Sequence, residues 1–119
     1  WYARRVDEAP RDDTRAAVLE LEDPELAFRY ARRVDRAPRD DTRAAALGSP
    51  GSAYCYAWKV DKAPRDDTRA AVLGDPGFAY EYARRVDKAP RDDTRAAAWR
   101  DSNQGRYYDR HFSLSVPPP

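Results

Sequence analysis

The 119-residue chain carries 22 Lys and Arg against 21 Asp and Glu. Its mean hydropathy of −0.99 leaves no apolar run long enough to span a bilayer. A single cysteine excludes an intrachain disulfide scaffold, and no signal-peptide pattern is present. We therefore expect an intracellular protein. Because the chain begins at Trp1 and has no methionine, we also expect a segment of a longer protein.

Large aliphatic residues are scarce. Leu, Ile, Val and Phe together number 16, whereas alanine numbers 21 and tyrosine 8. So few large apolar side chains raise the question of disorder. The near-zero net charge and the aromatic residues argue for folding instead.

Four copies of the sequence Val-Asp-x-Ala-Pro-Arg-Asp-Asp-Thr-Arg-Ala-Ala follow one another, each preceded by Tyr-Ala-x-x. The copies begin at Val6, Val34, Val60 and Val86, at intervals of 28, 26 and 26 residues. Self-similarity at such a period is typical of solenoids. We predict a repeat region over residues 1–99, divided into 2–29, 30–55, 56–81 and 82–99.

Each repeat is predicted to open with a helix that begins at a capping residue followed by proline, as at Asp75 and Pro76. The next apolar residues recur at the i, i+3, i+4, i+7 spacing of one helix face: Ala79, Tyr82, Ala83 and Val86. The helix should end at Ala-Pro, because the residue before proline is pushed out of the α region.

A second, shorter helix is predicted to begin at or near Pro64 and to stop at Gly74, a good C-cap residue. Asp66 and Asp67 would lie in its first turn, where carboxylates favour the positive end of the helix dipole. Paired aspartates could also suggest a metal site, but adjacent helix residues do not share a face. We favour capping and an exposed ion pair between Asp66 and Arg69.

Two helices this short cannot bury an apolar face alone, whereas stacked copies can. We therefore predict an all-α fold, an α-solenoid of about four two-helix repeats with a thin core of Ala, Tyr and Val. Residues 100–112 are predicted as a divergent helix that caps the last repeat. Residues 113–119, which end in three prolines, are predicted as an extended tail.

The pattern Asp-Pro-x-x-Ala-Tyr-x-Tyr-Ala-x-x-Val resembles short 26-residue tandem helical repeats of uncharacterised bacterial and phage proteins. More distantly, it is similar to HEAT-like and leucine-rich-repeat-variant solenoids. The residues that match are Asp75-Pro76, Ala79-Tyr80, Tyr82-Ala83 and Val86. The resemblance covers residues 2–99. It implies a stacked helical fold and supplies no catalytic residues.

Catalytic chemistry finds little support in the residue types. With one histidine, His111, and one cysteine, Cys55, no zinc ligand set exists, and no nucleophile–base motif is visible. We expect a protein that is not an enzyme and that has no cofactor and no metal.

The leading hypothesis is a scaffold that binds a protein or peptide, or that associates with itself by stacking head to tail. The predicted contact residues are aromatic side chains and the arginines that follow each Ala-Pro: Tyr54, Trp58, Tyr80, Arg39, Arg65 and Arg91.

Arginines near aromatic side chains would also suit single-stranded nucleic acid, which is the alternative hypothesis. The residue blocks 2–29, 30–55, 56–81 and 82–107 carry net charges of −3, +2, −1 and +3. Because no unit forms a continuous basic stripe, the charge pattern favours the scaffold.

Overall fold

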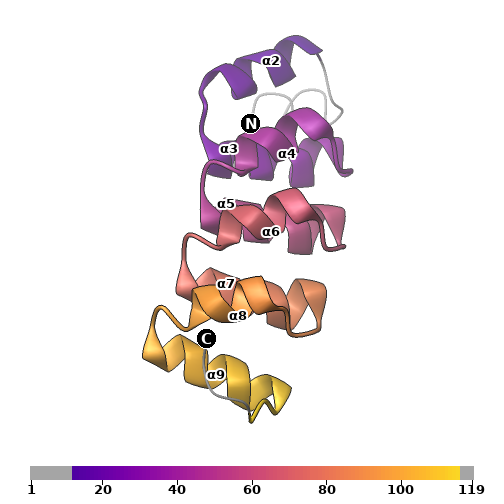
Figure 1. The fold of residues 1–119 in the computed structure, drawn as a ribbon. Helices are drawn as coiled ribbons and strands as arrows, with labels where there is room; N and C mark the ends of the chain where they lie inside the picture. The colour runs from indigo at the N-terminus through magenta and orange to yellow at the C-terminus, as the bar shows by residue number, and fades with distance from the viewer. Residues whose placement is uncertain (1–11, 116–119) are drawn as a thin grey trace.

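The computed structural model describes residues 12–115 and shows a rod of short helices stacked in chain order (Figure 1). The rod measures 53 × 21 × 20 Å. The part of the chain described is helical and contains no strand, which confirms the predicted all-α solenoid. None of its helices is long and apolar enough to cross a membrane.

The elements pair as the repeats predict. Each first helix is an α-helical segment continued by a π-helical turn, and the second helix follows after a short loop. In chain order they are α2 (Asp12–Glu20), α3 (Pro24–Tyr30), η1 (Ala31–Asp35), α4 (Asp40–Ala46), α5 (Pro50–Cys55), η2 (Tyr56–Asp61), α6 (Asp66–Val72), α7 (Pro76–Tyr82), η3 (Ala83–Asp87), α8 (Asp92–Ala98) and α9 (Ser102–Phe112). The predicted first helix of repeat 2–29 and the end of the predicted tail, 116–119, lie outside the described residues.

The first helices begin where the sequence predicts. The Asp75 carboxylate accepts hydrogen bonds from the amides of Gly77 and Phe78, at 2.8 and 3.2 Å, and Pro76 opens the helix. Asp23 caps α3 in the same way. Ser49 holds the equivalent place before α5, but its side chain makes no capping hydrogen bond.

The first helices end in a feature that the sequence did not predict. They end in π-helical turns. In the first of these, η1, the amide of Arg36 donates a hydrogen bond to the carbonyl of Ala31, five residues back, at 2.8 Å. The residues that follow the turns, Arg36, Lys62 and Lys88, have φ of 53°, 56° and 56°. This left-handed conformation is one that glycine adopts without penalty and that other residues adopt at a cost.

The second helices begin two residues after the proline, at Asp66 in the case of α6. Arg65, the residue before it, is extended with φ −141°. The next repeat holds this backbone in place, because the Tyr82 hydroxyl hydrogen-bonds both the amide and the carbonyl of Arg65. Pro64 therefore lies in the loop.

The core is the predicted stripe. In α7 and η3, Ala79, Tyr82 and Ala83 are 0 % exposed and Val86 is 7 % exposed. The same positions are buried in the two repeats before it: Ala27, Tyr30, Ala31 and Val34, and then Ala53, Tyr56, Ala57 and Val60. Small alanines let successive helices approach closely, and tyrosine and valine fill the layer between them.

Helix α9 covers the end of the stack, as predicted for residues 100–112, and lies beside α7 and α8 (Figure 1). Tyr108 is fully buried there. The Trp99 ring lies over Gly105, where a Cβ atom would come within 2.1 Å of its Cδ2. Helix α9 therefore packs where the first helix of another repeat would lie.

Candidate binding grooves

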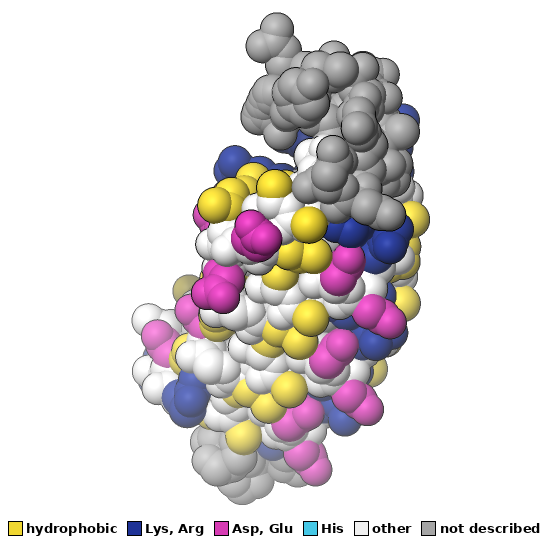
Figure 2. Space-filling view, turned by 90° about the horizontal axis from the view of Figure 1, so that it is seen from above, with side chains coloured by type: hydrophobic (Ala, Val, Ile, Leu, Met, Phe, Trp, Pro, Cys, Tyr) yellow, Lys and Arg dark blue, Asp and Glu magenta, His cyan; other side chains and the backbone are white. Residues whose placement is uncertain are grey.

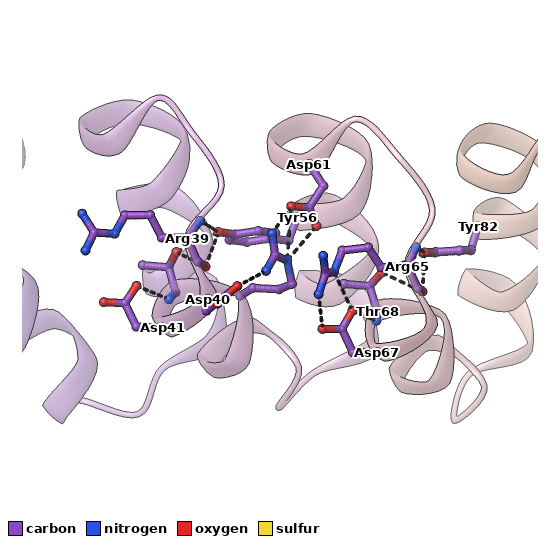
Figure 3. Close-up of polar contacts among 11 residues, drawn as sticks. Arg39, Asp40, Asp41, Tyr56, Asp61, Arg65, Asp67, Thr68 and Tyr82 are labelled. Atoms are coloured by element: carbon purple, nitrogen blue, oxygen red, sulfur yellow. Dashed lines mark hydrogen bonds and ion pairs between the residues drawn. The ribbon is translucent and has the colours of Figure 1, made fainter.

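Neighbouring repeats are joined by a buried hydrogen-bonded group, which we call the tyrosine latch. The Tyr82 hydroxyl accepts a hydrogen bond from the amide of Arg65 at 3.0 Å and lies 2.7 Å from the hydroxyl of Thr68 (Figure 3). Burial raises the pKa of Tyr82. The latch recurs at Tyr56 with Arg39 and Thr42, and at Tyr108 with Arg91 and Thr94.

An ion pair accompanies each latch, and it is buried at Arg43 and at Arg69. Arg69 donates to Asp87 of the next repeat at 2.6 Å and to Asp66 of its own helix at 2.8 Å. The hydrogen bond to Asp87 raises the pKa of Arg69 above its ordinary value. The predicted Asp66–Arg69 pair is confirmed, but Arg69 is 7 % exposed and does not lie on a solvated face. The Arg69 guanidinium lies between the repeats because it binds Asp87, which is 18 residues away in sequence.

These pairs remove carboxylates from the outer surface. The side chains of Asp61 and Asp87 are each 5 % exposed and are bound to Arg43 and Arg69. The basic residues that follow the same π-helical turns, Lys62 and Lys88, are exposed. Acidic and basic residues that are neighbours in the sequence are therefore separated in the structure, with the aspartate inside and the basic residue at the surface.

Two adjoining grooves lie between the π-helical turns, and we call them the Trp58 grooves. One lies between η1 and η2 with a volume of about 490 Å³, and the other lies between η2 and η3 with a volume of about 450 Å³. Trp58 and Lys62 line both. Among the described residues, no carboxylate lines either groove, whereas six cations do: Arg32, Arg36, Lys59, Lys62, Arg85 and Lys88.

The Trp58 side chain lies between the grooves and is held there by its packing contacts. Its ring stacks on Tyr54 with centroids 5.6 Å apart. The Lys59 Nζ lies 4.1 Å from the ring centroid, and the Arg85 Cζ lies 4.7 Å from it. Arg85 also pairs with Glu81 at 3.1 Å. The indole therefore positions cations toward both grooves.

Of the residues predicted as contacts, only Trp58 lines a groove. Tyr54 is 6 % exposed and packs in the core behind Trp58, so its ring does not form part of the surface. Burial raises the pKa of its hydroxyl. Tyr80 lies in an aromatic cluster at α9, 6.2 Å from the His111 ring and 6.3 Å from the Tyr107 ring.

The predicted arginines, Arg39, Arg65 and Arg91, are exposed at the starts of the second helices and line neither groove. Arg65 and Arg91 pair with Asp67 and Asp93 at 3.2 and 3.3 Å. Exposed aspartates lie in the same helix starts, at Asp40, Asp66 and Asp92. Figure 2 shows acidic side chains recurring along the molecule beside basic ones.

The groove cations at Arg36, Lys62 and Lys88 were missed from the sequence. A signal was present, because the variable position of Val-Asp-x-Ala-Pro is basic in these three copies and is Glu8 in the first. The sequence alone did not show that the aspartate before each of these residues turns toward the interior and leaves the cation on the surface.

Other reactive side chains form no site in residues 12–115. No group of His, Cys, Asp or Glu there could hold a metal ion. Cys55 is half-buried, and burial raises the pKa of its thiol. His111 is exposed and meets the Phe112 ring edge-on.

Comparison of the chain with protein-family models, with curated proteins and with solved structures found no match.

Proposed function

We propose that this protein is a non-enzymatic helical-repeat scaffold that binds a protein or peptide segment along the Trp58 grooves. One observation carries the proposal: two adjoining grooves share a fixed aromatic wall and are lined by six cations, with no carboxylate among the described lining residues. Aromatic and arginine side chains at a concave, rigid surface are common anchors of protein interfaces.

Single-stranded nucleic acid is the second candidate, because the same cations could contact phosphates. Its binding normally uses a series of aromatic faces on which bases stack. Here the Trp58 ring is already stacked on Tyr54 and approached by Lys59 and Arg85. Arg32 and Arg84 stand at the equivalent positions of the neighbouring repeats. The grooves therefore suit a polypeptide better.

Self-association by head-to-tail stacking is less well supported at the C-terminal end. Helix α9 already packs against α7 and α8, and Tyr108 of α9 completes the last tyrosine latch. A second copy would have to displace α9 in order to stack there. We therefore infer that the partner binds at the side of the rod.

Selection of random 12-residue peptides displayed on phage would test the proposal. Each enriched peptide would be measured by fluorescence polarisation against the wild-type chain and against the double variant Ala37→Gln and Ala63→Gln. Ala37 lines the first groove and Ala63 the second, so the longer side chains fill both without changing charge. We expect binding to weaken at least about tenfold, a loss of about 1.4 kcal/mol.

Ala89→Gln is the matched control, because Ala89 holds the same place in the next repeat and lines neither groove. Binding to this variant should equal that of the wild type. Failure to enrich any peptide, or peptides that bind all three proteins equally, would contradict the proposal.

A further inference from the structure

The Trp58 grooves also define the chemistry of the segment that binds there, and this inference rests on the proposed function. We propose that the partner segment is acidic and extended, with carboxylate side chains three residues apart that enter successive grooves. The charge, the spacing and the backbone of the groove residues each support this assignment.

The positive charge of the grooves favours an anionic ligand. The aspartates nearest in sequence to Lys62 and Lys88 are Asp61 and Asp87, and both are bound to arginines in the interior. Glu81 is the nearby carboxylate that does pair with a groove cation, Arg85. Within residues 12–115, the other groove cations form no ion pair with a carboxylate. Guanidinium and ammonium groups bind carboxylates through charge-assisted hydrogen bonds.

The separation of the grooves sets the spacing of the carboxylates. Neighbouring helices pack about 8–10 Å apart, and the two grooves recur once per repeat. A polyproline II segment rises about 3.1 Å per residue with three residues per turn. Side chains three residues apart therefore point the same way at intervals of about 9 Å. Acidic residues at every third position would match the grooves.

Single-stranded nucleic acid fits this surface less well. Its phosphates form a continuous track, whereas the grooves are separated by the Trp58 ring. The exposed Asp40 and Asp66 also lie at the starts of the second helices, one short loop away from Arg36 and Lys62. A continuous phosphate backbone would meet these carboxylates, while isolated carboxylates can enter the grooves singly.

The groove cations that follow the π-helical turns stand where the backbone favours glycine. Arg36, Lys62 and Lys88 adopt the left-handed conformation, where glycine would be free of strain. A long basic side chain at this position in three successive copies places a cation in the grooves at a cost to folding.

Fluorescence polarisation with synthetic peptides would test the inference. The probe is labelled (Pro-Pro-Glu)₅. The controls are (Pro-Pro-Gln)₅ and a peptide of the probe's composition whose glutamates are adjacent. At 50 mM salt we expect the probe to bind with a Kd below about 1 mM. We expect at least fivefold weaker binding of the clustered peptide, no binding of the neutral one, and weakening as salt rises.

Lys62→Gly separates binding from folding. Because glycine relieves the left-handed strain, this variant should unfold at the same or a higher urea concentration than the wild type, yet bind the probe about three- to tenfold more weakly. Lys62→Arg should bind like the wild type. Arg106→Gln, at an exposed position on α9, is the remote control and should leave binding unchanged.

Three outcomes of the polarisation measurements would overturn the inference: no binding of the probe, equal binding of the probe and the clustered peptide, or tighter binding of a labelled (dT)₁₅ oligonucleotide that is lost in Lys62→Gly. Failure of the proposed function would be distinguishable, because the phage selection would then yield no groove-dependent peptide. If phage selection yields groove-dependent peptides that lack acidic residues at every third position, the scaffold stands and the acidic partner does not.

Discussion

Buried polar side chains hold the repeats in register. Tyr82 and Thr68 belong to neighbouring repeats, as do Asp87 and Arg69. The Tyr82 hydroxyl and the Asp87 carboxylate find these partners across the boundary between repeats, so a slip between repeats would leave a buried hydroxyl or charge unpaired. The polar latch therefore contributes the specificity that a thin core of alanine cannot.

Tyr82→Phe should measure how much the tyrosine latch contributes to the free energy of unfolding. The change leaves the ring in place but removes the hydroxyl that binds the backbone of Arg65 and the side chain of Thr68. We expect the free energy of unfolding in urea to fall by about 1–3 kcal/mol, since buried partners are left unsatisfied. Tyr107→Phe, at a ring that is 47 % exposed, should change it by less than about 0.5 kcal/mol. Equal effects of the two changes would show that the latch contributes nothing.

The ion pair at α9 should make stability depend on pH. Arg95 donates to both oxygens of Asp109, at 2.9 and 2.8 Å, and this lowers the pKa of Asp109. A carboxyl with a lowered folded pKa stabilises fully above its unfolded value, about 4. The contribution is lost as the pH falls through the folded pKa.

The measurement compares the wild type with Asp109→Asn by urea unfolding between pH 6 and pH 3. We expect the wild type to be more stable at pH 6 and the difference to shrink as the pH falls below about 4. Glu20→Gln, at an exposed residue at the end of α2, should show a difference that changes little over this range. A difference between wild type and Asp109→Asn that is independent of pH would contradict the assignment.

The ends of the elements differ in how well the sequence marks them. An Asp-Pro pair fixes where α3 and α7 begin, because the carboxylate satisfies amides of the first turn and the proline fixes φ. The π-helical turns that end the first helices carry no such marker. They place Asp61 and Asp87 against arginines of the preceding repeats, and a helix examined alone cannot show that contact.

Asp75→Ala and Ser49→Ala form a matched pair of cap variants. Asp75 accepts two amide hydrogen bonds, whereas the Ser49 side chain accepts none. We expect Asp75→Ala to cost about 1 kcal/mol of unfolding free energy and Ser49→Ala to cost a few tenths at most. Urea titrations followed by circular dichroism would measure both. A loss as large for Ser49→Ala as for Asp75→Ala would contradict the capping geometry.

The described residues form a stack whose last repeat is covered by helix α9. Helix α9 closes it with Tyr108, which repeats the latch, and with the contact between Trp99 and Gly105, which is particular to this end. The absence of a side chain at position 105 lets the indole lie against the helix backbone. In repeat proteins, a terminal cap covers the apolar face that the last repeat would otherwise expose.

Gly105→Ala should undo this closure. The new Cβ would lie 2.1 Å from the Trp99 ring, so α9 must shift or the indole must move. We expect a loss of about 1–3 kcal/mol in unfolding free energy. We also expect self-association of the uncovered end, measured by size-exclusion chromatography with light scattering. Gly74→Ala, whose added Cβ would lie 3.9 Å from the Ala71 carbonyl oxygen and from the Pro50 Cγ, is the control and should remain like the wild type. An unchanged Gly105→Ala variant would show that the Trp99 contact is dispensable.

Much of the fold could be predicted from local pattern. Spacing alone identified the buried Ala79, Tyr82, Ala83 and Val86, and the Asp-Pro pairs identified the helix starts. The grooves could not be predicted in the same way. Which charges remain on the surface depends on partners far apart in the chain, such as Arg69 and Asp87, 18 residues apart.

The repeated pattern of Ala, Tyr and Val is enough to predict a stack of short helices, because it imposes the same buried face on every copy. Where charge accumulates depends instead on how the repeats pack. Packing one repeat on the next turned Asp61 and Asp87 inward and left Lys62 and Lys88 facing the grooves beside Trp58. A balanced composition became a surface with basic grooves, because each buried pair joins the aspartate beside a groove cation to an arginine from the second helix of the preceding repeat.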